Sequence, residues 1–193
     1  MKNLFHTEWL KIKNYRAFWW VMGITALTYP GINYIFLRVY KEITRENNEG
    51  AAVLKWLIGN PFAFPESWRT VGFFSSLFVF IPAIVIIMLV TNEFSFKTCR
   101  QNIIDGWSRN EFMKAKLADV IILSAIVTVL YALVAFFMGL ATTDSAIADK
   151  WELSYYVGLF ALQTFSQLSI AFMVGLLIRR AFIALAVFVF YFL

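Results

Sequence analysis

The chain has 193 residues, of which 61% are hydrophobic and only 15% are charged. An average soluble domain is about 45–50% apolar and about 25% charged, so a soluble fold of this size has too little interior for so much apolar surface. The composition therefore predicts a membrane protein. The net charge of +5 does not by itself indicate nucleic acid, and we expect no nucleic-acid partner.

The N-terminal segment 1–16 comes before the first long apolar run. Phe5, Trp9 and Ile12 follow one another at helical spacing and share one face, while the lysines lie mostly elsewhere. This pattern is typical of a helix that lies in the membrane interface. A plain positively charged anchor for the first span is an equally good interpretation.

Four apolar runs are each about as long as the 20 residues that cross a bilayer core as a helix. The predicted spans are 17–37, 71–91, 117–141 and 153–178. A fifth run, 181–193, covers only about 20 Å at 1.5 Å per residue, and we interpret it as a fifth span cut off by the end of the chain. We therefore predict an all-α polytopic transmembrane bundle that forms a single domain over residues 1–193.

The charges outside the spans predict the orientation. Residues 1–16, 92–119 and 179–180 together hold eleven Lys or Arg and five acids, whereas 38–70 and 142–152 hold six and seven. Cytoplasmic loops carry the excess of Lys and Arg, so we expect the first group, including the N-terminus, to be cytoplasmic.

The predicted external segment 38–70 is charged at first and then becomes apolar and aromatic. Asn60-Pro61 and Pro65 interrupt any long helix there. We predict a short amphipathic helix followed by an interfacial cap, with a substrate gate as the alternative.

The predicted cytoplasmic segment 92–116 has the pattern of two helices joined by a turn. Asp105-Gly106 is a turn signal. Ser108 is followed three residues later by Glu111, the spacing of a capping box that begins a second helix leading into the third span.

Several chemistries are missing. The chain has no P-loop motif for ATP, one histidine (His6) and one cysteine (Cys99), so it offers no His or Cys metal cluster and no internal disulfide. We predict no catalytic, cofactor-binding or metal-binding residue and no enzyme activity. Asp119 lies at the cytoplasmic mouth of the third span, where an ion pair with Lys116 is the simplest interpretation.

The fourth span carries Gln163 and Gln167 at i, i+4 with Ser166 between them. Polar groups in lipid need partners from neighbouring helices. These residues therefore either hold helices together or line a polar pathway between subunits.

The segment after the second span resembles the cytoplasmic loop of bacterial ABC-2 type transporter permeases. The matching residues are Glu93, Thr98, Ile104, Ser108-Arg109 and Lys116-Leu117, and TEWLKIKNYRAFW resembles the family's N-terminal opening. Lys97 stands where the family often has Gly, and Asp105-Gly106 where it often has Pro. Both departures keep a sequence that can form the turn.

The resemblance implies a permease subunit in the bacterial cytoplasmic (inner) membrane, with about six spans in a complete chain. A second permease subunit, identical or different, would pair with it. An ABC ATPase subunit would bind and hydrolyse ATP-Mg in the cytoplasm, and residues 97–104 would form the coupling helix that docks on it. The implied docking residues are Glu93, Lys97, Thr98, Arg100, Ile104, Arg109 and Lys116, with Lys114 as a further cation for electrostatic docking.

Two alternatives remain beside this implied function. Arg109 and Lys116 could instead anchor the loop to the phosphates of membrane lipid, although docking is the favoured interpretation of the segment. A membrane scaffold or assembly factor that transports nothing would use the same segment to dock a different cytoplasmic protein. The uncharged spans favour an apolar or amphipathic substrate for a transporter.

Overall fold

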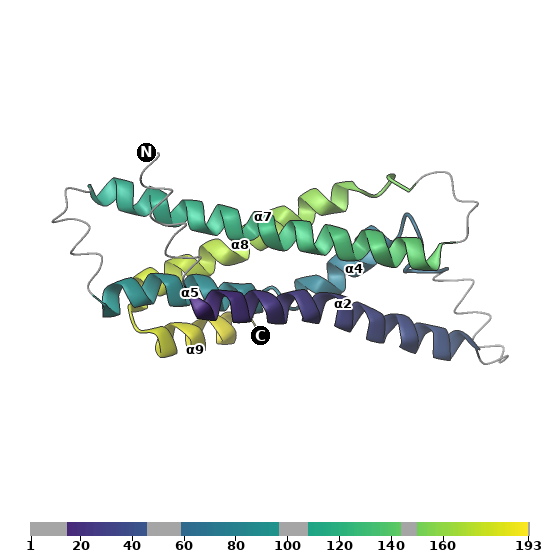
Figure 1. The fold of residues 1–193 in the computed structure, drawn as a ribbon, viewed down its shortest axis with the longest axis horizontal. Helices are drawn as coiled ribbons and strands as arrows, with labels where there is room; N and C mark the ends of the chain where they lie inside the picture. Colours follow the sequence, from purple (N-terminus) through teal and green to yellow (C-terminus); the bar gives the residue numbers. More distant parts are fainter. Residues whose placement is uncertain (1–14, 46–58, 97–107, 144–149, 193) are drawn as a thin grey trace. The chain divides into compact units, whose positions relative to one another are not determined.

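A computed structural model describes residues 15–45, 59–96, 108–143 and 150–192 (Figure 1). All regular secondary structure in these ranges is helical, which confirms the all-α class. The helices are α2 (Arg16–Arg45), α4 (Ser67–Ser76), α5 (Phe80–Ser95), α7 (Arg109–Thr142), α8 (Tyr155–Ile178) and α9 (Ala181–Phe192). The interfacial helix predicted at 1–16 lies almost entirely outside the described residues.

The C-terminal helices follow the predicted boundaries closely. The helix predicted to start after Ser108 and the third span form one continuous helix, α7. Helices α8 and α9 are separated only by Arg179 and Arg180, as the two apolar runs predict. Arg179 has φ 53°, a left-handed conformation that ends α8.

The second predicted span, 71–91, is not one helix. It is divided into α4 and α5, with a break at residues 77–79. Pro82 lies in the first turn of α5, where its missing N–H is tolerated. A helix continuing through the break would need that N–H for the carbonyl of residue 78 and would clash with the proline ring, so the break precedes Pro82.

The described helices offer fewer candidate spans than the four full spans that the sequence predicts. By length and composition, Asn110–Thr142 and Tyr155–Ile178 qualify, and α4 with α5 make a third if the bent pair is one span. Helix α2 has 30 residues but does not qualify, because its Trp, Tyr, Thr, Pro30 and Asn33 residues make it less apolar. Helix α9, with 12 residues, is too short.

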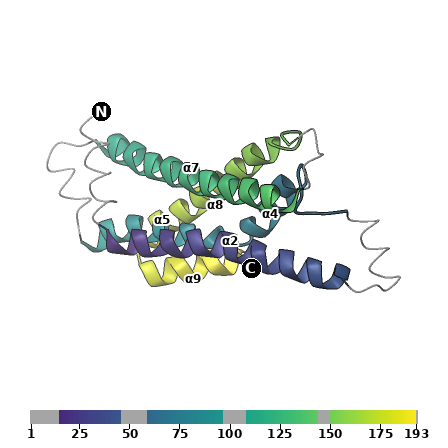
Figure 2. The same cartoon turned by 45° about the vertical axis from the view of Figure 1, so that its right-hand side comes forward.

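The chain divides into two compact units. Unit 1 comprises Met1–Thr25, Val79–Val127 and Gln163–Leu193. Helix α5 is its central element, with buried residues on several faces, and α9 lies along it (Figures 1 and 2). The rings of Phe80 and Phe192 contact each other with centroids 5.5 Å apart, and Gly175 of α8 brings its backbone close to Val90 of α5.

Unit 2 comprises Ala26–Phe78 and Thr128–Leu162, and aromatic side chains dominate its interior. Tyr29 and Tyr131 contact the ring of Phe160 at centroid distances of 6.4 and 4.2 Å. Residues 59–66 form turns rather than a helix, as the prolines predict. Phe62 and Phe64 of these turns are each only 2% exposed, so this connection belongs to the core of unit 2.

Candidate functional site

The N-terminal end of α7 carries the capping box that the sequence predicts. The Ser108 hydroxyl accepts a hydrogen bond from the Glu111 backbone N–H at 3.2 Å. In return, the Glu111 carboxylate accepts from the Ser108 backbone N–H at 2.9 Å and from its hydroxyl at 2.8 Å. These contacts satisfy donors that a helix leaves open at its start, so α7 begins at a defined residue.

A buried ion triad joins the end of α5 to the first turns of α7. The Lys116 ammonium lies 2.7 Å from a carboxylate oxygen of Glu93 and 3.4 Å from one of Asp119. Glu93, Lys116 and Asp119 are 7%, 3% and 4% exposed, so all three charges are shielded from solvent. The predicted pair of Lys116 and Asp119 is confirmed, and Glu93 joins it from another helix.

The effect of the triad on stability depends on whether all three charged side chains are present. Removing one partner of a buried ion pair typically costs about 3–5 kcal/mol, because the remaining charge loses its compensation. The intact pair adds little net stability over apolar residues of the same size. The triad therefore specifies the register of α5 against α7 more than it strengthens their packing.

Two further contacts tie the last turn of α5 to other parts of unit 1. The Asn92 side-chain amide donates to the Tyr15 hydroxyl at 2.9 Å, next to the start of α2. The Arg179 guanidinium lies 5.3 Å from the ring centroid of Phe94, within cation–π range, at the end of α8. We call Tyr15, Asn92, Glu93, Phe94, Lys116, Asp119 and Arg179 the anchor cluster.

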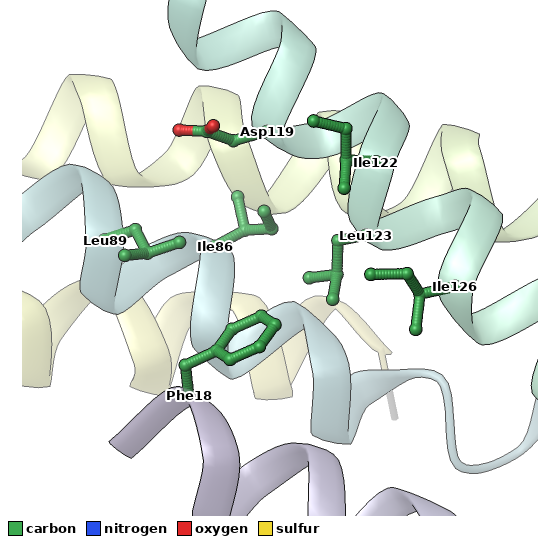
Figure 3. Close-up of a pocket in the computed structure, with 7 residues that line it drawn as sticks. All are labelled: Phe18, Ile86, Leu89, Asp119, Ile122, Leu123 and Ile126. Atoms are coloured by element: carbon green, nitrogen blue, oxygen red, sulfur yellow. The ribbon is translucent and has the colours of Figure 1, made fainter. Parts of the chain in front are cut away.

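A small hollow lies beside the anchor cluster (Figure 3). Ile86 and Leu89 of α5 face α7 across it, and Asp119 lies at its edge. Its volume is about 10 Å³, roughly what a single water molecule needs. The hollow is therefore too small for a substrate.

Most of the predicted docking residues lie outside the part of the chain that the structure describes. Lys97, Thr98, Arg100 and Ile104 fall within residues 97–107, and the side chain of Arg109 is likewise outside it. Glu93 and Lys116 lie where a docking surface is not expected, because both side chains are buried in the triad. Their positions indicate support for the segment rather than direct contact with a partner.

The predicted polar residues of α8 share one face of the helix, and most of that face is exposed. Gln163 and Ser166 are exposed, whereas Gln167 is half-buried and its side-chain oxygen has no hydrogen-bond partner among the described residues. Thr164, which the sequence analysis did not single out, is completely buried. The structure brings none of these predicted pathway residues into the anchor cluster.

Sequence reasoning also missed a polar contact within unit 2. Asn33 is completely buried, and its side-chain amide donates to the Tyr29 carbonyl at 2.8 Å and to the Ser75 hydroxyl at 3.2 Å. An asparagine within an apolar helix was the available signal. Among the described residues, no group of three or more His, Cys, Asp or Glu side chains is arranged to hold a metal ion.

The described part of the chain is thus all-helical, and two or three of its helices are suited to crossing a membrane. The anchor cluster lies where the last turn of α5 meets α7. Residues 48–193 match the family described as "Protein of unknown function (DUF2705)", and the chain belongs to this family. No curated protein matches the sequence. No solved structure matches the fold.

Proposed function

We propose that the chain is the membrane-spanning permease subunit of an ABC-2 type transporter, which moves an apolar or amphipathic substrate with energy from a separate ATPase subunit. The chain itself would bind no ATP and catalyse no reaction. A second permease subunit, identical or different, completes the pathway. The complex resides in the bacterial cytoplasmic membrane with the N-terminus in the cytoplasm.

The observation that supports this proposal best is the ion triad. The predicted coupling segment, 92–116, contains both Glu93 and Lys116, and the predicted coupling helix 97–104 lies between them in the sequence. Glu93 and Lys116 contact each other at 2.7 Å. This ion pair joins the two helices that flank the predicted coupling helix, as a lever requires if a partner's movement is to reach them.

The rest of the anchor cluster extends this argument. Tyr15 at the start of α2 and Arg179 at the end of α8 both contact the last turn of α5. A displacement of that turn would be passed to three other helices through side-chain contacts. A loop that only connected two spans would not need so many.

The topology proposed here has α2 as a crossing in addition to the two or three helices that qualify by composition. Its 30 residues make it about 45 Å long at 1.5 Å per residue, more than the roughly 30 Å of a bilayer core. Its large exposed side chains, among them Trp20 and Leu27 at 75% and 76%, are apolar and suit contact with lipid.

The decisive experiment is co-purification with an ABC ATPase subunit expressed together with this chain. We expect Arg100→Glu and Ile104→Asp to abolish association or the stimulated ATPase activity while membrane insertion is retained. The matched control is Lys41→Glu, a charge reversal at the other end of α2, which should leave both unchanged.

Three outcomes would contradict the proposal. Full association and ATPase stimulation in both variants would exclude docking through this segment. Capture of a different cytoplasmic protein, lost in the same two variants, would favour the scaffold or assembly factor instead. Labelling of a cysteine at position 100 only from outside the cell would exclude both.

A further inference from the structure

An open apolar groove lies within unit 2, along one face of α7. Val129, Ala132, Leu133 and Phe136 of α7 form its floor at spacings of three and four residues, so they share one face of the helix. Trp151, which is 65% exposed, and Trp68, which is only 3% exposed, also line it, and we call this pair the tryptophan wall. The groove is wide open and has a volume of about 520 Å³.

The tryptophan wall is held in place by several contacts. The Trp68 and Trp151 rings stack with centroids 5.8 Å apart, and Trp151 stacks in turn on Phe136 at 6.2 Å. The Trp68 indole N–H donates to the Lys150 backbone carbonyl at 2.9 Å. These contacts fix the positions of both tryptophan side chains beside the groove.

The floor of the groove is apolar and accessible. Val129 and Leu133 are 59% and 53% exposed, and Trp151 is 65% exposed. Ser154 is the one lining residue with a polar side chain other than the two indoles. Covering such a surface with an apolar chain is favourable by about 25 cal/mol for each Å² removed from water.

Two cationic residues lie next to the tryptophans in the sequence. Arg69 follows Trp68 and Lys150 precedes Trp151, and both are exposed. Arg69 pairs with Glu66 at 3.1 Å, but its side chain is 59% exposed, and such a surface pair contributes little. The groove therefore has an apolar lining, and the chain carries a cationic residue next to each of its tryptophans.

We propose that this groove binds a membrane phospholipid, with an acyl chain along α7 and the phosphate near Arg69 and Lys150. Tryptophan indoles prefer the level of the lipid headgroups, and Arg and Lys bind phosphate oxygens, so both ends of the site fit this amphipathic molecule. The inference rests on the membrane position proposed above and not on the transport role.

The test uses the full-length protein in an uncharged detergent and a phospholipid that carries a photoreactive diazirine in its acyl chain. After illumination, mass spectrometry locates the crosslinks. We expect them to concentrate on residues 129–136. Excess unlabelled phospholipid should displace the probe from the wild-type protein, whereas diacylglycerol with the same acyl chains should displace it about tenfold less well.

Matched variants separate the groove from the rest of the apolar surface. Ala132→Phe fills the floor and should lower the crosslink yield about tenfold. Ala141→Phe is the control, because it introduces the same ring nine residues later, about two and a half turns away and hence on the opposite face of α7. The double variant Arg69→Gln, Lys150→Gln should lower capture of the phospholipid without lowering capture of a diazirine-labelled diacylglycerol.

Three results would overturn the inference. Equal displacement by phospholipid and diacylglycerol would remove the phosphate site, and this measurement needs no variant to fold. Crosslinks spread evenly over all exposed helix faces would indicate unspecific contact with detergent or lipid. Crosslinks between two protein chains at residues 129–136 would assign the groove to a second copy. None of these results depends on an ATPase, so they leave the transporter proposal untouched.

Discussion

The interiors of the two compact units are stabilised by different kinds of contact. Unit 1 has the anchor cluster, in which Lys116 satisfies two buried carboxylates from separate places in the chain. Unit 2 has stacked rings and single hydrogen bonds, such as the one from the Tyr131 hydroxyl to the Trp68 carbonyl at 2.5 Å. Removing one partner of a buried ion pair costs much stability, because a charge is left uncompensated. In aromatic packing the stabilisation is spread over many contacts, so the loss of one contact costs less.

This difference matches what each unit is proposed to do. A lever that receives movement from a partner needs one fixed register, and an incomplete ion triad is costly enough to exclude other registers. A surface that binds lipid needs an apolar face with a rigid aromatic wall, which stacking provides without buried charge. The substitutions below test whether the contrast between the units is real, from the largest expected effect to the smallest.

Removal of the central cation of the triad should have the largest effect. We expect Lys116→Met to destabilise the protein by about 3–5 kcal/mol, because two buried carboxylates lose their shared counter-charge. Lys114→Met changes an exposed lysine two residues earlier and should be close to neutral. The measurement is the fraction of protein that remains monodisperse after stepwise heating in detergent. Equal thermal behaviour of both variants would contradict the role of the triad.

The closest approach in unit 2 should give the next largest effect. A Cβ on Gly139 would lie 2.5 Å from the Phe64 ring, which is itself 2% exposed and has little room to move. Gly139→Ala should therefore cost about 1–3 kcal/mol by overpacking. Gly158→Ala, where nothing lies within 4 Å, should instead stabilise its helix by up to about 1 kcal/mol. Thermal midpoints that shift in the same direction would show that the packing of Phe64 is loose.

Loss of the cap at the start of α7 should be smaller and local. Ser108→Ala removes the hydroxyl that accepts from the Glu111 N–H, which should cost about 1 kcal/mol. Hydrogen exchange should become faster at the first turn of α7 but not near Tyr131. Asn110→Ala, an exposed neighbour, provides the control. Equal exchange rates at the first turn of α7 in both variants would show that the Ser108 cap does not stabilise this turn.

A single buried hydroxyl in unit 2 should have the smallest effect. Tyr131→Phe removes the hydrogen bond to the Trp68 carbonyl, and such bonds between membrane helices average about 0.6 kcal/mol. Tyr191→Phe, at an exposed position on α9, should change nothing. The difference between their thermal midpoints measures the bond. A loss of stability in Tyr131→Phe as large as that in Lys116→Met would contradict the proposed difference between the units.

The sequence by itself determined the features that depend on neighbouring residues. The all-helical class, the capping box at Ser108 and Glu111, the pair of Lys116 with Asp119 three residues later and the division between α8 and α9 all follow from local spacing. Helix periodicity and capping depend on residues within one or two helical turns, so they can be predicted from the sequence alone.

Only the tertiary structure decided which distant residues meet. It placed Glu93 against Lys116, Phe64 against Gly139 and Trp68 against Trp151. Such contacts depend on the packing of whole helices, and many apolar side chains of α7 or α8 would have served equally well as partners. Hydrophobic composition alone does not specify which side chains contact each other. The shape of the side chains and the pairing of buried charges do specify these contacts.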